Sequence, residues 1–321
     1  MTSRRLFCIA AAASAATSAW AQGAVPAGWP DKPLHFVTPY PPGGLSDQIT
    51  RFVADRISRS IGRPVIVDNK PGAGATLGTE FAARAAPDGY NFFVAPTATV
   101  VVSPWLRKVS FRPEDFAPVA KLTSSYGLIT TRKDAPFNTY REFVVAARAA
   151  PGKYTFASNG VGSIVHLTGV LLQKQAGIEV VHVPYKGSVE SMTDLMGGRI
   201  DLMYDPVTLP RVKAGELKGL ATTNPERNPE LPEVPTLKEQ GFDMDTRSWF
   251  GMFAPRGTPP AIVARMAEEA RKAMSGPGVR EQMLLSSMYP DYEPPAAFEQ
   301  RVRADNAFFR DIIQREDIKA D

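Results

Sequence analysis

Short apolar runs alternate along this chain with longer segments in which apolar residues recur at helical spacing. The alternation predicts βα units, packed as mostly parallel sheets with helices on both faces. With 321 residues, the chain is long enough for two such domains. The runs expected to form strands are residues 34–38, 65–68, 91–95, 127–131, 154–157, 180–183, 201–204, 219–222 and 248–254.

Two segments carry the spacing of amphipathic helices. The first follows the run 34–38, and Ser46 is its candidate N-cap because a serine hydroxyl can accept a bond from an unpaired backbone N–H. Its apolar face would hold Leu45, Ile49, Phe52, Val53 and Ile57. The second segment covers residues 295–318, with a stripe made of Phe298, Val302, Phe309 and Ile313.

Residues 1–21 have the pattern of a cleavable export signal. Arg4 and Arg5 precede the apolar run 6–16, which is too short to span a bilayer, and the segment 19–21 matches an A-x-A cleavage site. The pattern fits general secretion and also resembles a twin-arginine signal, so the export route stays open. The one cysteine, Cys8, lies in this segment. The mature protein would therefore tolerate an oxidising compartment, and we expect a soluble periplasmic protein.

Charge and motif content exclude several classes of function. The formal net charge of +4 is too small, and too evenly spread, for a nucleic-acid-binding protein. The histidines, His35, His166 and His182, are isolated, which argues against a metal site. No Walker A, H-E-x-x-H or G-x-S-x-G motif occurs. The glycines of residues 72–78 have the spacing G-x-G-x-x-x-G, which differs from a dinucleotide fingerprint. We expect no cofactor and no catalytic residue.

Glycine-rich turns form two groups along the chain. Residues 41–44 and 71–74 belong to the first group, and residues 158–163 and 185–187 to the second. Ligands of open α/β sheets bind beyond the carboxyl ends of strands, where such turns lie. The two groups predict two lobes facing each other across a cleft. Lobe 1 would comprise residues 22–124 with 248–290, lobe 2 residues 125–247, and the C-terminal helix, 291–321, would pack across both.

The turn after the first strand has features of an anion site. Its glycines allow close backbone approach, and a helix follows whose first N–H groups have no intrahelical acceptor. No arginine lies in this turn, so backbone donors would have to replace the hydration of an anion. The candidates for ligand contact in lobe 1 are Tyr40, Gly43, Gly44, Leu45, Ser46, Thr76 and Thr97. Asp47, in the first helical turn, is assigned to the helix dipole instead.

The second group of turns supplies the opposite wall. Its candidates are Ser158, Asn159, Gly160, Gly162, Ser163, His166, Tyr185 and Asp205. Structural alternatives stay open for two of them, since His166 can serve packing and Asp205 can cap a helix. The hydroxyl of Tyr204 is expected beside the cleft.

Taken with the export signal, a series of short motifs spanning nearly all of the mature chain resembles the Bug family, the periplasmic receptors of tripartite tricarboxylate transporters. The matching residues are Trp29-Pro30, Lys32-Pro33, 39–44 with Asp47 and Arg51, 65–74, 87–90, 115–119, His166-Leu167, 182–187, Asp194-Leu195 with Gly198, 231–236, Trp249 with Gly251, Ala254-Pro255 and 257–259. Each motif is weak alone, and their number and order make the resemblance specific.

The resemblance implies an α/β fold of the type II periplasmic binding protein class, with two α/β lobes, mixed or parallel sheets and a ligand cleft between them. It implies capture of a small organic acid by a monomeric receptor. The receptor would then dock on a membrane transporter with one large and one small integral subunit. Amino acids, dicarboxylates, tricarboxylates and aromatic acids all remain open as ligands.

Two other functions fit parts of the sequence. The same fold and cleft could serve a sensor kinase instead of a transporter. An exported hydrolase would need a nucleophile, and Ser163, His166 and Asp205 supply the residue types of a catalytic triad. Ser163 and His166 lie three residues apart on one expected helix, and no motif supports a strained nucleophile. We therefore expect a binding protein and not an enzyme.

Overall fold

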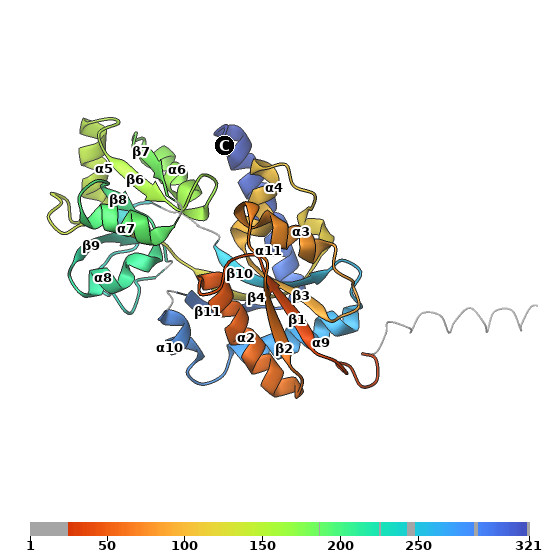
Figure 1. The fold of residues 1–321 in the computed structure, drawn as a ribbon. Helices are drawn as coiled ribbons and strands as arrows, with labels where there is room; N and C mark the ends of the chain where they lie inside the picture. Colours follow the sequence, from red (N-terminus) through yellow and green to blue (C-terminus); the bar gives the residue numbers. More distant parts are fainter. Residues whose placement is uncertain (1–24, 186, 225, 243–247, 286–287, 320–321) are drawn as a thin grey trace, which may run out of the picture.

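The chain folds into two α/β lobes joined by two crossing segments (Figure 1). The structure, a computed structural model, describes residues 25–185, 187–224, 226–242, 248–285 and 288–319. The expected export signal, 1–21, and Lys186 of the turn 185–187 lie outside the described residues. No helix among the described residues is long and apolar enough to cross a membrane.

The first lobe is built on a six-stranded sheet with the order β11-β4-β10-β3-β1-β2. Its strands are β1 (Leu34–Thr38), β2 (Val65–Asn69), β3 (Asn91–Pro96), β4 (Phe116–Ser125), β10 (Trp249–Pro255) and β11 (Met288–Glu293). Its helices are α2 (Leu45–Ile61), α3 (Thr76–Ala83), α4 (Ser103–Leu106), α9 (Pro260–Met274), α10 (Val279–Leu284) and α11 (Pro295–Arg315), with short helical turns η1 (Ala73–Ala75), η2 (Ala98–Val102) and η3 (Pro113–Asp115).

The second lobe is built on a five-stranded sheet with the order β7-β6-β8-β5-β9. Its strands are β5 (Leu128–Arg132), β6 (Thr155–Ser158), β7 (Val181–Pro184), β8 (Leu202–Met203) and β9 (Leu217–Thr222). Its helices are α5 (Tyr140–Ala149), α6 (Ile164–Ala176), α7 (Ser188–Met196) and α8 (Leu209–Lys213), with turns η4 (Pro206–Thr208) and η5 (Lys238–Gln240).

The strands are apolar on both faces because each sheet is covered on both sides. In β1, Phe36 packs with α2 and α9, whereas Val37 packs with η2 and α11 on the opposite face. Phe92 and Phe93 of β3 divide in the same way. Successive side chains of a strand point to opposite faces, so an unbroken apolar run is what a sheet buried on both faces requires. This explains why continuous apolar runs located these strands in the sequence.

The expectation of mostly parallel sheets is wrong. β1 pairs in parallel with β2 and β3, and β6 pairs in parallel with β7 and β8. However, β10 lies antiparallel between β3 and β4, and β5 lies antiparallel to both β8 and β9. β11 is also antiparallel to β4. β5 and β10 are each the first strand after a crossing between the lobes, and each enters its sheet in the direction opposite to the neighbouring strand of the βα units.

The C-terminal helix packs mainly on the first lobe. α11 contacts β4, η2 and α4, and its apolar stripe, including Phe298 and Phe309, is buried there. Beyond its last turn, Glu316 pairs with Lys174 of α6 in the second lobe. The expected helical segment 291–321 also contains the end of β11, so the helix itself begins at Pro295.

The two segments that cross between lobes are hydrogen-bonded to each other. The N–H of Ser125 donates to the carbonyl of Ser248 over 2.9 Å. At the second-lobe end of the first crossing, the N–H of Gly127 donates to Oγ1 of Thr223 over 2.6 Å, and the N–H of Thr223 donates to the Gly127 carbonyl over 2.9 Å, which extends the ladder between β5 and β9. The first crossing is therefore joined to the return crossing at Ser248 and to the second-lobe sheet at Thr223.

Candidate functional site

A cavity of about 680 Å³ lies between the two lobes, and we call it the cleft cavity. Residues of the expected first-lobe turn line one side, and residues that follow β6, β8 and the turn 185–187 line the other. Ser125, Gly127 and Ser248 of the crossings also line it. The predicted residues on its wall are Tyr40, Gly44, Leu45, Ser46, Asn159, Gly162, Ser163 and Asp205. The structure thus brings the two glycine turns together around one space.

The N-terminus of α2 supplies backbone donors to the cavity. The helix begins at Leu45, and Gly44 occupies the N-cap position without a side-chain cap. Since the first N–H groups of a helix have no intrahelical acceptor, those of Leu45 and Ser46 are suited to an anion. The expectation that Ser46 is the N-cap is wrong. Its hydroxyl lies inside the helix, 2.8 Å from Oγ1 of Thr38, and so fixes the helix to β1.

Gly43 shapes this turn rather than lining the cavity. Its φ of 88° lies in the left-handed region that favours glycine, and its N–H donates to Oδ2 of Asp47 over 2.9 Å. Asp47 is buried and also accepts bonds from Arg51 and Asn69. Burial opposes its charged form, but these hydrogen bonds outweigh burial and hold the pKa of Asp47 below its usual value. Asp47 therefore keeps the turn rigid.

Tyr40 links this turn by hydrogen bonding to Asn69 and places its hydroxyl near Thr99. Its carbonyl accepts a bond from Nδ2 of Asn69 over 3.0 Å, and its hydroxyl lies 3.5 Å from Oγ1 of Thr99. Burial raises the pKa of the Tyr40 phenol, so the hydroxyl stays protonated. The half-buried ring forms part of the cavity wall.

Arg107 is a wall residue that the sequence analysis missed. It follows α4 directly and lines the cavity from the first lobe. A Cβ at Gly74 would lie 3.3 Å from its guanidinium carbon, so the glycine leaves room for this side chain. No carboxylate of the described residues pairs with it. Guanidinium is a strong partner for carboxylates, and no motif around residue 107 signals this position.

On the second-lobe wall, Asp205 is the centre of a small polar network. Its Oδ2 accepts bonds from Nδ2 of Asn159 over 3.0 Å and from the hydroxyl of Ser188 over 2.7 Å. Its Oδ1 accepts the N–H of Val207 over 2.9 Å, which caps η4. Ser188, another missed wall residue, follows the glycine turn 185–187, whose position was the available sequence indication.

The turn before α6 makes a contact between the lobes. Gly162 has a φ of 78°, and a Cβ there would lie 2.1 Å from Cδ1 of Leu106 in the first lobe. Ser163 caps α6, because its hydroxyl accepts the N–H of His166 over 3.2 Å. Leu167, one turn further along, is buried in the apolar cluster of the first lobe that contains Val102. The lobes therefore touch beside the cavity.

His166 and His182 form a stacked pair behind this turn. Their ring centroids lie 4.0 Å apart. Nδ1 of His166 accepts the Gly162 N–H over 3.1 Å, and Nε2 of His182 lies 2.6 Å from the Ser158 hydroxyl. Burial lowers the pKa of His166, and burial with the neighbouring His166 lowers the pKa of His182 to about 4. Both rings are neutral at pH 7, and His166 supports the turn from behind.

Several other predicted residues do not line the cleft cavity. Thr76 donates to the Ala73 carbonyl, and Thr97 exchanges hydrogen bonds with the backbone of Trp249. Gly160 accepts a bond from the Ser158 hydroxyl. Tyr185 donates to Asp194 over 2.7 Å, and burial together with this carboxylate raises its pKa to about 12. Each of these groups has a partner within the protein.

The expected position of the Tyr204 hydroxyl is wrong. The residue lines the cavity, but it is only 1% exposed and packs in the second-lobe core. Burial, followed by the neighbouring phenol of Tyr140, raises the pKa of its hydroxyl well above the usual value. Tyr204 therefore presents ring surface, and not a hydroxyl, to the cleft.

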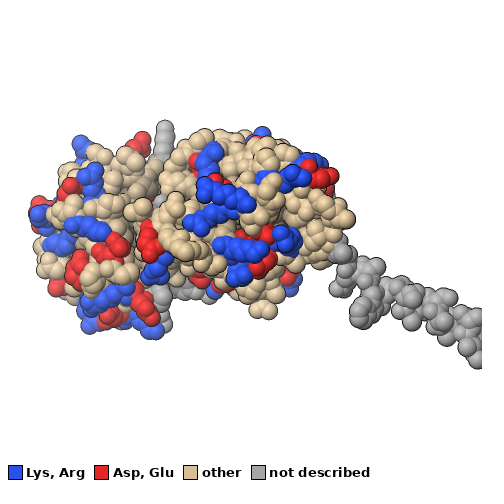
Figure 2. All heavy atoms as spheres, turned by 90° about the horizontal axis from the view of Figure 1, so that it is seen from below, with Lys and Arg blue, Asp and Glu red and all other residues tan. Residues whose placement is uncertain are grey.

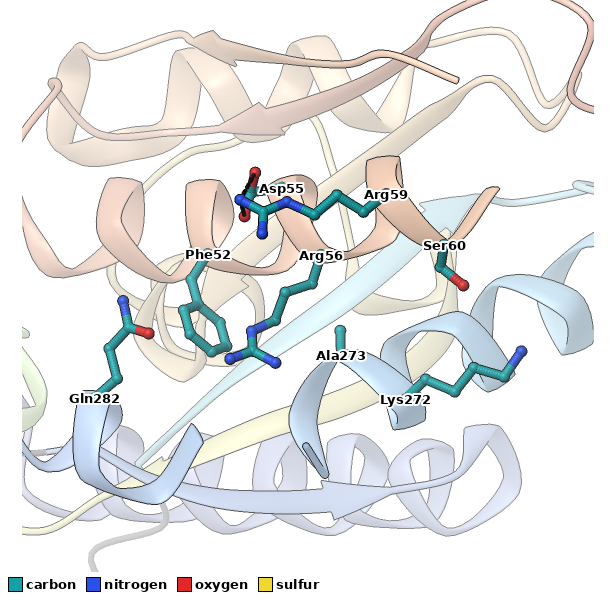
Figure 3. Close-up of a pocket in the computed structure, with 8 residues that line it drawn as sticks. All are labelled: Phe52, Asp55, Arg56, Arg59, Ser60, Lys272, Ala273 and Gln282. Carbon is teal, nitrogen blue, oxygen red and sulfur yellow. Dashed lines mark hydrogen bonds and ion pairs between the residues drawn. The ribbon is translucent and has the colours of Figure 1, made fainter. Parts of the chain in front are cut away.

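A second hollow lies on the first lobe alone, between α2 and the α9–α10 region (Figure 3). Its wall includes Arg56, Arg59 and Lys272, and basic side chains gather over the first lobe on the face seen in Figure 2. Arg59 pairs with Asp55, and Lys272 pairs with the buried Glu269. Because this hollow lacks a second lobe and two of its three cations are paired with carboxylates, the cleft cavity is the better candidate site. The described residues contain no metal-binding cluster of His, Cys, Asp or Glu.

Gly44→Val should remove ligand binding while leaving the fold intact. The φ of −77° suits any residue, and the nearest atom to an added Cβ, the Pro41 carbonyl oxygen, lies 3.9 Å away. The valine methyl groups would instead occupy the cavity beside the helix N-terminus. We expect affinity for a bound carboxylate to fall by at least about a hundredfold, measured by calorimetry, with an unchanged melting temperature. Gly44→Ala should give a smaller loss, and unchanged affinity in both variants would contradict the assignment.

The histidine pair should make stability depend on pH. The pKa of His182 is about 4 in the folded protein against 6.5 for a free histidine, so the unfolded chain binds more protons between these values. The contribution of His182 to the free energy of unfolding is therefore fully present above pH 6.5 and is lost as the pH falls towards 4. We expect His182→Gln to reduce this pH dependence by on the order of 2 kcal/mol, measured by urea unfolding from pH 4 to 7. His35→Gln is the matched control, and equal slopes for wild type and His182→Gln would refute the effect.

Comparisons with known proteins agree with this architecture. A family model described as the tripartite tricarboxylate transporter family receptor matches residues 49–317. A UPF0065 protein of Pseudomonas sp. strain P51 is 38% identical over 262 residues, covering 79% of this chain and 77% of the relative. Protein BugT of Bordetella pertussis is 30% identical over 277 residues, covering 83% of this chain and 84% of BugT.

Solved structures give the same result. One described as a periplasmic transporter has a TM-score of 0.80 at 32% identity, covering 91% of this chain and 100% of that one. Rpa4515 of R. palustris with adipate has a TM-score of 0.79 at 28% identity, with 91% and 99% coverage. MatC from Rhodopseudomonas palustris with bound malate has a TM-score of 0.74 at 29% identity, with 89% and 100% coverage. The chain therefore belongs to the family of tripartite tricarboxylate transporter receptors, which includes the Bug proteins.

Proposed function

We propose that this protein is a periplasmic receptor that captures a small organic acid between its lobes. The receptor then delivers the acid to a tripartite tricarboxylate-type membrane transporter with one large and one small integral subunit. It acts as a monomer and without catalysis. The observation that carries this proposal is the cleft cavity, where the N-terminus of α2 and Arg107 face the second-lobe wall. Family membership and the carboxylates bound in two solved relatives support it.

The arrangement of donors explains how a carboxylate could be held. Moving a carboxylate out of water is costly unless several hydrogen bonds replace its hydration. The N–H groups of Leu45 and Ser46 supply directed donors, and the guanidinium of Arg107 supplies a mobile cation. The wall residues of the first lobe thus match one carboxylate group.

A comparison of interaction energies shows why both lobes are needed for binding. A helix dipole contributes about 0.3–1 kcal/mol on an exposed surface, whereas micromolar affinity requires about −8 kcal/mol. Contacts with the second lobe, near Asn159 and Ser163, would supply part of the difference and exclude water from the cleft. Rotation about the crossings joined at Ser125 and Ser248 would bring that wall onto the ligand.

Binding should stabilise and compact the protein. We expect one class of organic acid in a thermal-shift panel to raise the melting temperature, because a ligand that binds only the folded state stabilises it by mass action. The same acid at saturation should reduce the radius of gyration in X-ray scattering. Gly44→Val should show neither response. A panel without any positive acid would contradict the function, and binding at unchanged radius would contradict lobe closure.

Transport should require the receptor and its membrane partners together. Deleting the gene for this protein should abolish uptake of the radiolabelled acid, and deleting the genes for the two membrane subunits should do the same. Complementation with wild type should restore uptake, and Gly44→Val should not. Normal uptake with loss of a transcriptional response would instead identify a receptor for a sensor kinase. Conversion of the acid to a product by the pure protein would identify an enzyme.

A further inference from the structure

Side chains of opposite charge lie on the two walls of the cleft cavity. Among the described residues that line it, Arg107 from the first lobe and Asp205 from the second are the side chains with a full charge at neutral pH. The charges of the described wall residues therefore cancel. A bound acid with one carboxylate adds a single negative charge, and an acid with two carboxylates adds two.

Arg107 provides the positive charge for only one carboxylate. It is exposed in the absence of a ligand and lies against Gly74. The backbone donors at Leu45 and Ser46 lie on the same lobe as Arg107, and we assign both to the same end of a ligand. Along the rest of the described wall there is no second Lys or Arg for another carboxylate.

Asp205 places a fixed negative charge on the opposite wall. The residue is 5% exposed, and three donors hold its carboxylate: Asn159, Ser188 and the N–H of Val207. These donors orient the carboxylate without neutralising it, and no Lys, Arg or His of the described residues forms an ion pair with it. A second ligand carboxylate near this wall would meet a like charge in a partly dehydrated space, which is strongly unfavourable.

Most of the remaining wall is apolar. The side chains that enclose the body of a ligand include Pro41, Pro42, Leu45, Val161, Ile164 and Val165. Such a lining favours hydrocarbon or aromatic surface through the hydrophobic effect. The hydroxyl and amide side chains on the same wall, such as Ser125, Asn159 and Ser163, can hydrogen-bond a polar group but carry no positive charge for a second carboxylate.

We propose that this receptor selects organic acids with one carboxylate and an apolar body, and that Asp205 excludes dicarboxylates and tricarboxylates. This inference rests on the proposed function, since it specifies the acid that the same cavity takes. The carboxylate binds at the N-terminus of α2 and Arg107. The apolar body extends towards Val161 and Ile164, and Asp205 sets the charge at the far end.

Two matched pairs of acids test the proposal on the wild-type protein. Hexanoate and adipate have the same number of carbons and differ by one carboxylate, and benzoate and terephthalate provide the aromatic counterpart. Dissociation constants are measured by calorimetry at pH 7 and constant ionic strength. We expect the monocarboxylate of a pair that binds to be preferred by at least about tenfold. Equal or tighter binding of the dicarboxylate would overturn the selectivity and leave the proposed receptor function standing.

Failure of the receptor function gives a different result. If neither these pairs nor any acid of a wider carboxylate panel binds, the proposed function fails, and the selectivity fails with it. If other carboxylates of the panel bind but neither monocarboxylate does, the selectivity alone is overturned.

Variants assign the selectivity to Asp205. Asp205→Asn keeps a carbonyl acceptor for one neighbour and removes the charge, so the preference for hexanoate over adipate should fall by at least about fivefold. Asp134→Asn, an exposed carboxylate paired with Arg132 outside the cavity, should retain the wild-type ratio. An unchanged ratio in folded Asp205→Asn would overturn the role of Asp205. If that variant does not fold, the ratio measured for the wild type still decides the selectivity, and Arg107→Gln, which should weaken hexanoate by about tenfold, tests the placement of the carboxylate.

Discussion

In the function proposed above, the cost of removing a carboxylate from water governs the design of this cleft. A buried carboxylate needs several hydrogen bonds in place of its hydration shell, and mobile donors would lose entropy when they provide them. Here the donors belong to the backbone at the start of α2, and the hydrogen bonds of Asp47 to Gly43, Arg51 and Asn69 hold that turn in place before any ligand arrives. The turn is thus preorganised, and its rigidity depends on side chains that never reach the cavity.

The sequence located most of the regular structure because both sheets are covered on both faces. Strands such as β1 and β3 consist of consecutive apolar residues, and such runs are visible without any tertiary information. β4 and β11 escaped this reasoning. β4 contains Lys121, which is buried only because Asp291 and Glu293 of β11 bind its ammonium group. A strand whose burial depends on ion pairs with residues about 170 positions away cannot be recognised from its own composition.

The sequence predicted those parts of the site that consist of backbone groups. The glycine turns at Gly44 and Gly162 were visible, and both lie on the cavity wall. Whether a side chain reaches the cavity depends on residues that are distant in the sequence. Thr97 had seemed available for a ligand, but the backbone of Trp249 occupies its hydroxyl. Arg107 lay in a segment without a motif, and only the fold brings it beside Gly74.

The paired crossings determine how the lobes can move. The bond from Ser125 to Ser248 joins the two crossing segments, and the bonds between Gly127 and Thr223 fix the first segment to the end of β9. Sliding or stretching one segment would break these bonds, whereas twisting both together would preserve them. A rotation about this connection is therefore the opening movement that we expect, as in hinge motions of other two-domain proteins. In such a rotation, entry of the acid and release of water occur in the same movement, and the mouth of the cleft widens most at the edge farthest from the hinge.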